Sequence, residues 1–220
     1  FKQRLMGLIG NAAHFVEIKT FHSYCFDLLG RIGNLDDVGG VVAKAAEMIN
    51  NGEVEQNHIG KSVLVIDEAQ DMGKDDYALV CALMAANEDM RVIAVGDDDQ
   101  NIFEFRGSDS KYMYSLSQVP GGHFIQMTEN YRSSRQIVDA ANDFVKSIRQ
   151  RLKVVPIVAM MDEDGEVSLI RHVSQYMYMP VADDLMRCGK GTTCLLTQTN
   201  DEAVVMLALL NRRGVRVKLI

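Results

Sequence analysis

Two short apolar runs predict neighbouring buried strands, and each run ends in polar residues. Residues 63–66 are all apolar, and Asp67 and Glu68 follow them directly. Residues 91–95 are apolar after the first position and lead into the glycine-flanked loop 96–107. A short apolar run bounded by polar residues is typical of a strand buried in a parallel sheet. Because ligands of open α/β sheets bind beyond the carboxyl ends of the strands, we expect Asp67 and Glu68 at a binding site.

Apolar residues at spacings of three and four predict amphipathic helices elsewhere in the chain. Ser133 or Ser134 is expected to cap the start of one of them through its hydroxyl group. Residues 52–60 predict a polar turn, and residues 176–179 predict a strand with alternating faces. The periodic positions are Val38, Val41, Val42, Ala45, Met48 and Ile49 in one helix and Ile137, Ala140, Ala141, Phe144, Val145 and Ile148 in another.

The two acids that follow residues 63–66 have the chemistry that nucleotide hydrolysis requires. Mg²⁺ prefers hard oxygen ligands and keeps several of its waters, so one or two carboxylates plus substrate phosphates suffice to hold it. Asp67 can hold the ion, and Glu68 can activate a water molecule. Taken alone, the pair is equally compatible with solvated acids that cap a helix.

Aromatic residues stand in loop 96–107, where packing is not the usual role of a side chain. Phe103 and Phe105 flank an acid and precede Arg106. One interpretation is that both rings fold back into the core. The other is that they form a platform on which nucleic-acid bases stack.

Tyr131 and Arg132 precede the predicted helix that begins near Ser134. They therefore lie outside its apolar face, in a position to contact a ligand. An arginine there can stabilise charge on a transferring phosphoryl group. A simple surface ion pair is the competing interpretation.

In this order, the segments resemble motifs of the superfamily 1 DNA helicases of the UvrD/Rep/PcrA type. Asp67 to Asp71 resemble the Walker B motif, residues 95–107 the family's motif III, and residues 128–133 its motif IV. Residues 18–23 are similar to the family's Thr-Phe-His segment, which an apolar helix follows, so the resemblance implies a helix at residues 24–29. Residues 193–220 are similar to the family's strand and helix that begin Leu-Tyr-Arg-Thr-Asn. The resemblance therefore covers nearly the whole chain.

The resemblance implies a role for each position that matches a family motif. The catalytic residues would be Glu68 as general base, Gln100 as γ-phosphate sensor and Arg132 as arginine finger. ATP and its Mg²⁺ would be held by Asp67, Gln70 and Tyr131, with Asp67 and Glu68 nearest the ion. Single-stranded DNA would be contacted by Thr20, Phe21, His22, Phe103, Phe105 and Arg106.

The implied fold class is α/β, with two RecA-like P-loop NTPase motor folds whose parallel sheets are flanked by helices, both of them incomplete. Residues 1–119 would be the C-terminal part of the first motor domain, with a reduced accessory insertion at about residues 31–60. Residues 120–220 would be the N-terminal part of the second, because Pro120 begins the compact Pro-Gly-Gly break between the motifs.

One family feature is missing from these 220 residues, the phosphate loop Gly-x-x-x-x-Gly-Lys-Ser/Thr. The simplest interpretation is an excerpt of a longer polypeptide whose remainder is needed for ATP binding. We therefore expect the isolated segment to have little or no ATPase or helicase activity.

The implied function is an ATP-dependent DNA helicase that translocates 3′ to 5′ on single-stranded DNA and unwinds duplex junctions, in repair or recombination. A helicase-nuclease of the RecB/AddA kind shares these motifs. A non-catalytic, helicase-derived DNA-binding module has no chemical need to keep Glu68, Gln100 and Arg132 together. An unrelated α/β ATPase would not explain the aromatic loop.

The formal net charge of −7 argues against a broad basic surface of the kind that usually binds nucleic acids. A local groove remains compatible with it. The acids are concentrated in residues 67–76 and 97–99, where Mg²⁺ would offset part of the charge. The apolar runs are far shorter than the ~20 residues that cross a bilayer, so a cytoplasmic location is expected. The nearby positive residues are Arg106, Lys111, Arg132 and Arg135.

Overall fold

The computed structural model describes residues 2–31, 40–171, 173, 176–187 and 191–219. The chain forms two compact units, Phe1–Gly165 and Glu166–Ile220. The α-helices are α1 (Lys2–Ile9), α2 (Phe21–Arg31), α3 (Val41–Asn50), α4 (Gln56–Ile59), α5 (Lys74–Ala86), α6 (Lys111–Ser117), α7 (Arg135–Phe144), α8 (Tyr178–Arg187) and α9 (Asn200–Arg212). The strands are β1 (Val63–Ile66), β2 (Arg91–Ala94), β3 (Glu129–Asn130) and β4 (Val158–Ala159). The 3-10 turns are η1 (Gly10–Phe15), η2 (Ala69–Asp71), η3 (Asp98–Gln100), η4 (Glu104–Arg106) and η5 (Val145–Ser147).

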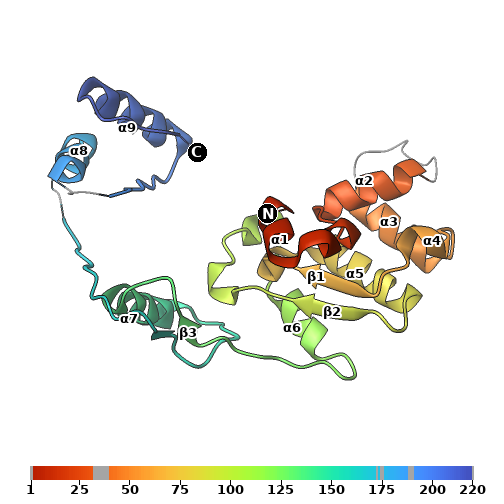
Figure 1. The fold of residues 1–220 in the computed structure, drawn as a ribbon. Coiled ribbons are helices and arrows are strands. Elements are labelled where there is room, and N and C mark those ends of the chain that lie inside the picture. Colours follow the sequence, from red (N-terminus) through yellow and green to blue (C-terminus); the bar gives the residue numbers. More distant parts are fainter. Residues whose placement is uncertain (1, 32–39, 172, 174–175, 188–190, 220) are drawn as a thin grey trace. The chain divides into compact units, whose positions relative to one another are not determined.

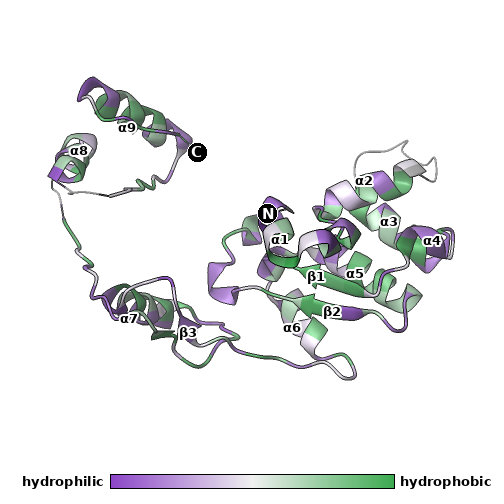
Figure 2. Ribbon diagram, in the orientation of Figure 1, coloured by the Kyte–Doolittle hydropathy of each residue, from purple (hydrophilic) through white to green (hydrophobic). Residues whose placement is uncertain are grey.

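The two strands predicted from apolar runs are confirmed as a parallel pair, β1 and β2. Figure 2 shows both strands coloured mainly as hydrophobic. On one face Leu64, Ile66 and Val92 pack into the core. On the other face Val63 and Val65 are exposed. The predicted burial of β1 is therefore met on one face only, because alternate residues of a strand point to opposite faces.

The core of the first unit lies between β1–β2 and the helices α2, α3 and α5, which Figure 1 shows gathered beside the strands. The predicted helices at residues 24–29 and 38–49 are confirmed as α2 and α3, except that Val38 lies outside the described residues. The prediction of a polar turn at residues 52–60 was wrong in part. The last four of its residues before Gly60 form α4, because Gln56 Nε2 and Asn87 Nδ2 anchor that turn to neighbouring carbonyl groups.

A second parallel pair, β3 with β4, lies beside α7 in the part of the chain that follows Pro120. Asn142 of α7 holds Ile157 just before β4, donating to Ile157 O at 2.8 Å and accepting from Ile157 N at 3.1 Å. Ser134 takes the N-cap position of α7, but the predicted hydroxyl cap is not formed. Its Oγ is buried without a partner among the described residues, and Gly165 packs so closely that a Cβ there would lie 2.0 Å from it.

The second unit consists of α8 and α9, which pack through Ala182, Met206 and Leu210. The prediction of a strand at residues 176–179 was wrong, since α8 begins at Tyr178 and continues a helical pattern through Val181 and Leu185. The helix expected within residues 193–220 is confirmed as α9. The strand expected before it is not formed in the described residues, where no partner strand lies beside it.

The fold is therefore α/β, with small parallel sheets and helices packed against them. The compact units divide at Gly165, whereas the proposed boundary between two motor domains lies at Pro120 and stays a prediction. Residues 120–165 group with the first unit because residues 151–153 contact the loop after β2. No helix in the described part of the chain is both long and apolar enough to span a membrane.

Candidate functional site

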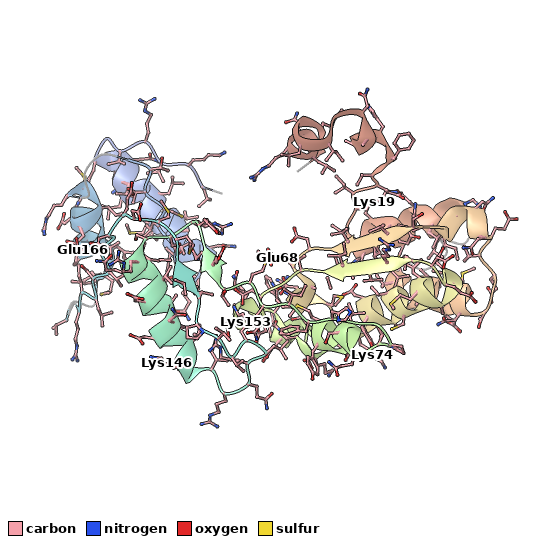
Figure 3. All side chains as sticks on the ribbon, turned by 60° about the horizontal axis from the view of Figure 1, so that its bottom comes forward. Lys19, Glu68, Lys74, Lys146, Lys153 and Glu166 are labelled. Carbon is pink, nitrogen blue, oxygen red and sulfur yellow. The ribbon has the colours of Figure 1, made fainter. Side chains whose placement is uncertain are left out.

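The candidate site lies where β1 and β2 end side by side. Ile66 pairs with Ala94, and two hydrogen bonds extend the pairing beyond it. Val95 N donates to Ile66 O at 2.8 Å, and Ala69 N donates to Val95 O at 2.8 Å. This pairing brings the acids after β1 next to the polar loop after β2, as the parallel arrangement predicts. Figure 3 labels Glu68 at this end of the strand pair.

Asp67 and Glu68 are both exposed at this edge. Glu68 precedes η2 without a side-chain bond that caps it, and Asp67 Oδ1 accepts the adjoining backbone N–H of Glu68 at 3.2 Å. Glu68 has the left-handed backbone conformation, at φ 52° and ψ 46°. It is the one non-glycine residue with positive φ in the described chain. Such strain costs of order 1–3 kcal/mol and is concentrated at functional sites, so it favours the catalytic interpretation over the capping one.

The two carboxylates fit the requirements of Mg²⁺. Hard oxygen atoms are its preferred ligands, and the side chains of Asp67 and Glu68 are exposed beyond the end of β1. Within the described residues, neither carboxylate forms an ion pair. Both are therefore available to a cation.

The acids at residues 97–99 differ, because basic residues form ion pairs with two of them, Asp97 and Asp99. Asp99 accepts a forked pair of bonds from Arg151, from Nε at 2.6 Å and from Nη2 at 2.7 Å. Lys153 Nζ lies 3.1 Å from Asp99 Oδ2 and also contacts Asp97. One carboxylate oxygen from each of Asp97, Asp98 and Asp99 lies within 4.8 Å of the others, a grouping that could hold a metal ion. The ion pairs offset part of the charge, and the expectation that Mg²⁺ offsets part of it stays a prediction. The missed signal was the basic character of residues 149–153, which lie far from the acids in sequence.

The pairing of Asp99 with Arg151 predicts a pH-dependent contribution to stability. Bonds from Arg151 and then Lys153 hold the pKa of Asp99 below its ordinary value of 3.8. A lowered pKa in the folded state stabilises the fold above pH 3.8, and this contribution is lost as the pH falls through the folded pKa. We expect Asp99→Asn to lower the free energy of unfolding by about 1–3 kcal/mol at pH 7, measured by urea denaturation.

The same comparison at pH 3 should show a smaller difference between Asp99→Asn and the unsubstituted protein. Asp143→Asn is the matched control, because the ion pair of Asp143 with Lys146 is highly exposed and such pairs contribute little. Equal losses for the two variants at pH 7 would contradict the structural importance of the Asp99 contact.

Gln100 and Gln70, the two glutamines predicted to serve the nucleotide, have different surroundings. Gln100 is exposed, and its Nε2 donates to Asp97 Oδ2 at 2.7 Å. Gln70 is only 2% exposed, and both ends of its amide are bonded to protein atoms. Its contact with the nucleotide stays a prediction, while its observed contacts are with Glu68 and Asp97.

Phe103, Phe105 and Arg106 form one cluster after η3. The two ring centroids lie 6.2 Å apart, and the Arg106 guanidinium carbon lies 5.2 Å from the Phe103 centroid and 5.3 Å from that of Phe105. Asn101 Oδ1 holds the loop by accepting bonds from Phe103 N and from the Ser108 hydroxyl. Phe105 is 78% exposed, so it does not fold back into the core. The arrangement leaves an aromatic face available for stacking.

Because Phe105 is exposed, replacing it should affect DNA binding without affecting folding. We expect Phe105→Ala to weaken binding of single-stranded DNA by about 5- to 150-fold, since stacking on an aromatic ring contributes roughly 1–3 kcal/mol per base. Fluorescence anisotropy with a labelled oligonucleotide measures the effect. Phe144→Ala is the matched control, because Phe144 is 75% exposed at the end of α7. Unchanged affinity for DNA in a folded Phe105→Ala variant would contradict the stacking role of this ring.

The Thr-Phe-His residues begin α2 and divide into packed and exposed positions. Thr20 Oγ1 accepts the backbone N–H of Ser23 at 3.2 Å, which caps the first turn. Phe21 is half-buried and packs against the core. His22 is exposed. Thr20 and Phe21 thus position the helix, and the contact of these three residues with DNA stays a prediction.

Tyr131 and Arg132 follow β3 and are both exposed. Asn130 Oδ1 accepts from Arg132 N at 3.0 Å and from Ser133 N at 2.8 Å, so the turn is fixed without the arginine side chain. The Tyr131 hydroxyl donates to Glu129, and this bond raises the pKa of Tyr131 above 10.0. In the described chain, Arg132 forms no ion pair, and no hydrogen bond joins it to Asp67 or Glu68.

Parallel strands that end in adjacent acids are typical of α/β proteins that hydrolyse nucleotides. More narrowly, residues 31–120 match the family described as the UvrD/REP helicase N-terminal domain. This match confirms the resemblance that the motifs indicate: residues 31–120 are similar to the N-terminal domain of UvrD/Rep helicases.

Individual relatives agree with the family match. The chain is 30% identical over 130 residues to the ATP-dependent DNA helicase Rep of Buchnera aphidicola subsp. Schizaphis graminum, covering 58% of this chain and 19% of that protein. It is 31% identical over 146 residues to DNA helicase II of Escherichia coli K12, covering 65% and 20% respectively. With PcrA of Staphylococcus epidermidis the identity is 38% over 87 residues, covering 39% and 12%. The chain thus spans no more than a fifth of the length of these relatives.

Proposed function

We propose that this chain is part of the motor of an ATP-dependent DNA helicase. The motor would couple ATP hydrolysis to 3′ to 5′ translocation on single-stranded DNA and to duplex unwinding, in repair or recombination. One observation carries the proposal. The acids after β1 adjoin the loop after β2, and that same loop continues into the cluster of Phe103, Phe105 and Arg106. Residues suited to hydrolysis and residues suited to strand binding are thus adjacent in one short segment.

The roles proposed at the strand ends follow from the chemistry of phosphoryl transfer. That reaction depends on positioning and on stabilising negative charge. Mg²⁺, when bound with ATP, would neutralise charge on the phosphate oxygens. Asp67 would hold the ion, and Glu68 would accept the proton of the attacking water. Gln100 would contact the γ-phosphate.

The roles proposed for the segment after β3 concern the opposite side of the nucleotide. Tyr131 would lie against the adenine, and Arg132 would approach the phosphates when two RecA-like halves close. The halves would meet near Pro120. Their closure on ATP and their opening after hydrolysis would let the two sides alternate their hold on DNA. The free guanidinium of Arg132 in the described chain supports this role.

The isolated 220 residues should hydrolyse little ATP, because their sequence contains no Gly-x-x-x-x-Gly-Lys-Ser/Thr loop. The test therefore uses a native polypeptide that carries both this chain and such a loop. ATP hydrolysis is measured with and without single-stranded DNA, and unwinding is compared on duplexes with a 3′ tail or a 5′ tail. Stimulation by DNA and preference for the 3′ tail are expected. Hydrolysis that ignores DNA would contradict the motor, and preference for the 5′ tail would contradict the polarity.

A further inference from the structure

Gln70 is a polar side chain in the core, directly behind the candidate site. It is 2% exposed and follows Ala69, which is completely buried. Burying an amide without hydrogen-bond partners costs free energy of folding. The partners of the Gln70 amide therefore account for its place in the core. Gln70 Nε2 donates to Glu68 Oε2 at 2.8 Å. Its Oε1 accepts the backbone N–H of Asp97 at 2.9 Å. The single side chain therefore joins the end of β1 to the end of β2.

The connection continues from Asp97 to Gln100. One carboxylate oxygen of Asp97, Oδ2, accepts from Gln100 Nε2 at 2.7 Å. The other, Oδ1, accepts from Asp99 N at 3.1 Å and from Lys153 Nζ. A continuous chain of hydrogen bonds thus runs from the Glu68 carboxylate through Gln70 and Asp97 to the Gln100 amide.

Gly96 has no side chain, and this lets its backbone pass close to the Gln70 amide. A Cβ at Gly96 would lie 2.5 Å from Gln70 Oε1 and 3.0 Å from Ala69 N. The close approach of Gly96 lets the next amide, that of Asp97, reach the Gln70 side chain. The two strand ends are held at a fixed separation by this fit and by the bond from Ala69 N to Val95 O.

We propose that Gln70 and Asp97 are positioning residues that hold Glu68 and Gln100 in one mutual geometry and transmit a displacement of either to the other. The proposal rests on the proposed function for the roles of Glu68 and Gln100. An amide is the group that meets the demands at position 70, since it donates to a carboxylate at one end and accepts a backbone N–H at the other. Hydrogen bonds to a charged group are also stronger than those between neutral groups.

The chain of hydrogen bonds that ends at Gln100 adjoins the loop that carries the proposed DNA-binding residues Phe103 and Phe105. Gln100 is followed at once by Asn101, which holds Phe103 through its side chain. A displacement of Gln100 should therefore move Asn101, and with Asn101 the backbone of Phe103 that its side chain holds. Loss of the connection should lower the turnover number and its stimulation by DNA. ATP affinity should change little, because both ends of the buried Gln70 amide are bonded to protein atoms in the structure.

Amide hydrogen exchange at Asp97 tests the geometry without any need for activity. In Gln70→Met, which keeps the volume but removes both bonds, exchange should accelerate by about tenfold. In Gln70→Glu the carboxylate still accepts the Asp97 N–H, so protection should persist. Gln118→Met is the control, because Gln118 is exposed at the end of α6 and bonds to its neighbour Ser117. Unchanged exchange in Gln70→Met would overturn the connection.

Kinetics in the native polypeptide test the positioning role. Both Gln70→Met and Gln70→Glu should lower kcat for DNA-stimulated ATP hydrolysis by roughly 10- to 100-fold with KM for ATP within about twofold, as expected for loss of an interaction that serves the transition state alone. The second variant serves where the first fails to fold. Unchanged kcat in a folded variant would overturn the positioning role. Absence of hydrolysis by the unsubstituted protein would instead contradict the proposed function, while the exchange measurement still decides whether the connection exists.

Discussion

Glu68→Gln is expected to lower kcat for DNA-stimulated ATP hydrolysis by about 10²- to 10⁴-fold, the usual contribution of a general base. Glutamine has nearly the same size as glutamate but cannot accept the proton of the attacking water. Its side-chain oxygen can still accept the bond from Gln70 Nε2, which spans 2.8 Å in the structure. The backbone at position 68 and the neighbouring Asp67 should therefore keep their positions.

Nucleotide binding separates this chemical effect from a general loss of the site. A fluorescent ATP analogue should bind Glu68→Gln with nearly the same Kd as the unsubstituted protein, because Asp67 remains available to Mg²⁺. Glu88→Gln is the matched control, since Glu88 is exposed in the turn that precedes β2, at the opposite end of the strand pair. Undiminished turnover in Glu68→Gln would remove Glu68 from the role of general base.

The centre of the site could be predicted from sequence because its determinants are local. Apolar runs at residues 63–66 and 91–95 specify β1 and β2, and polar residues follow each run directly. Once both strands are taken as parallel neighbours, the acids at positions 67 and 68 must adjoin the loop after β2. The helix α3 was equally predictable, since five of the residues predicted from helical spacing lie in it and are buried: Val41, Val42, Ala45, Met48 and Ile49.

Contacts between distant segments could not be predicted in this way. Arg151 and Asp99 are separated by 52 positions, and nothing in a local pattern shows that they meet. The burial of Gln70 was also hidden, because a glutamine beside two acids is expected in solvent. Its partner Asp97 lies 27 positions away, on the loop of another strand.

Predictions from a few consecutive residues were wrong where packing against a neighbouring element determines the structure. Residues 176–179 alternate as a strand does, yet the chain becomes helical at Tyr178 because Ala182 packs with Met206 and Leu210 of α9. Ser134 stands where a capping serine is favoured. Its hydroxyl is nevertheless turned into a buried position against Gly165. In both cases tertiary packing overrides a local preference that was correctly identified.

Arg132→Ala is expected to lower kcat for ATP hydrolysis by about 10³- to 10⁵-fold, the range for removal of an arginine finger. The loss should be chemical rather than structural. The Asn130 side chain fixes the turn through the backbone N–H groups of Arg132 and Ser133, and the Arg132 side chain is exposed. The melting temperature should therefore stay within about 2 °C of the original, as for surface substitutions that alter stability by less than ~0.5 kcal/mol.

Arg132→Lys distinguishes the geometry of the guanidinium from its charge. Lysine keeps a positive charge but lacks the planar fork that bonds two phosphate oxygens at once, so most of the loss should remain. Arg149→Ala is the control, because Arg149 is also exposed and lies beyond α7. Recovery of full turnover by lysine would show that charge alone suffices. Equal turnover of Arg132→Ala and Arg149→Ala would assign Arg132 to the surface, and it would leave Glu68 and Gln100 without a cation that faces them when the motor closes.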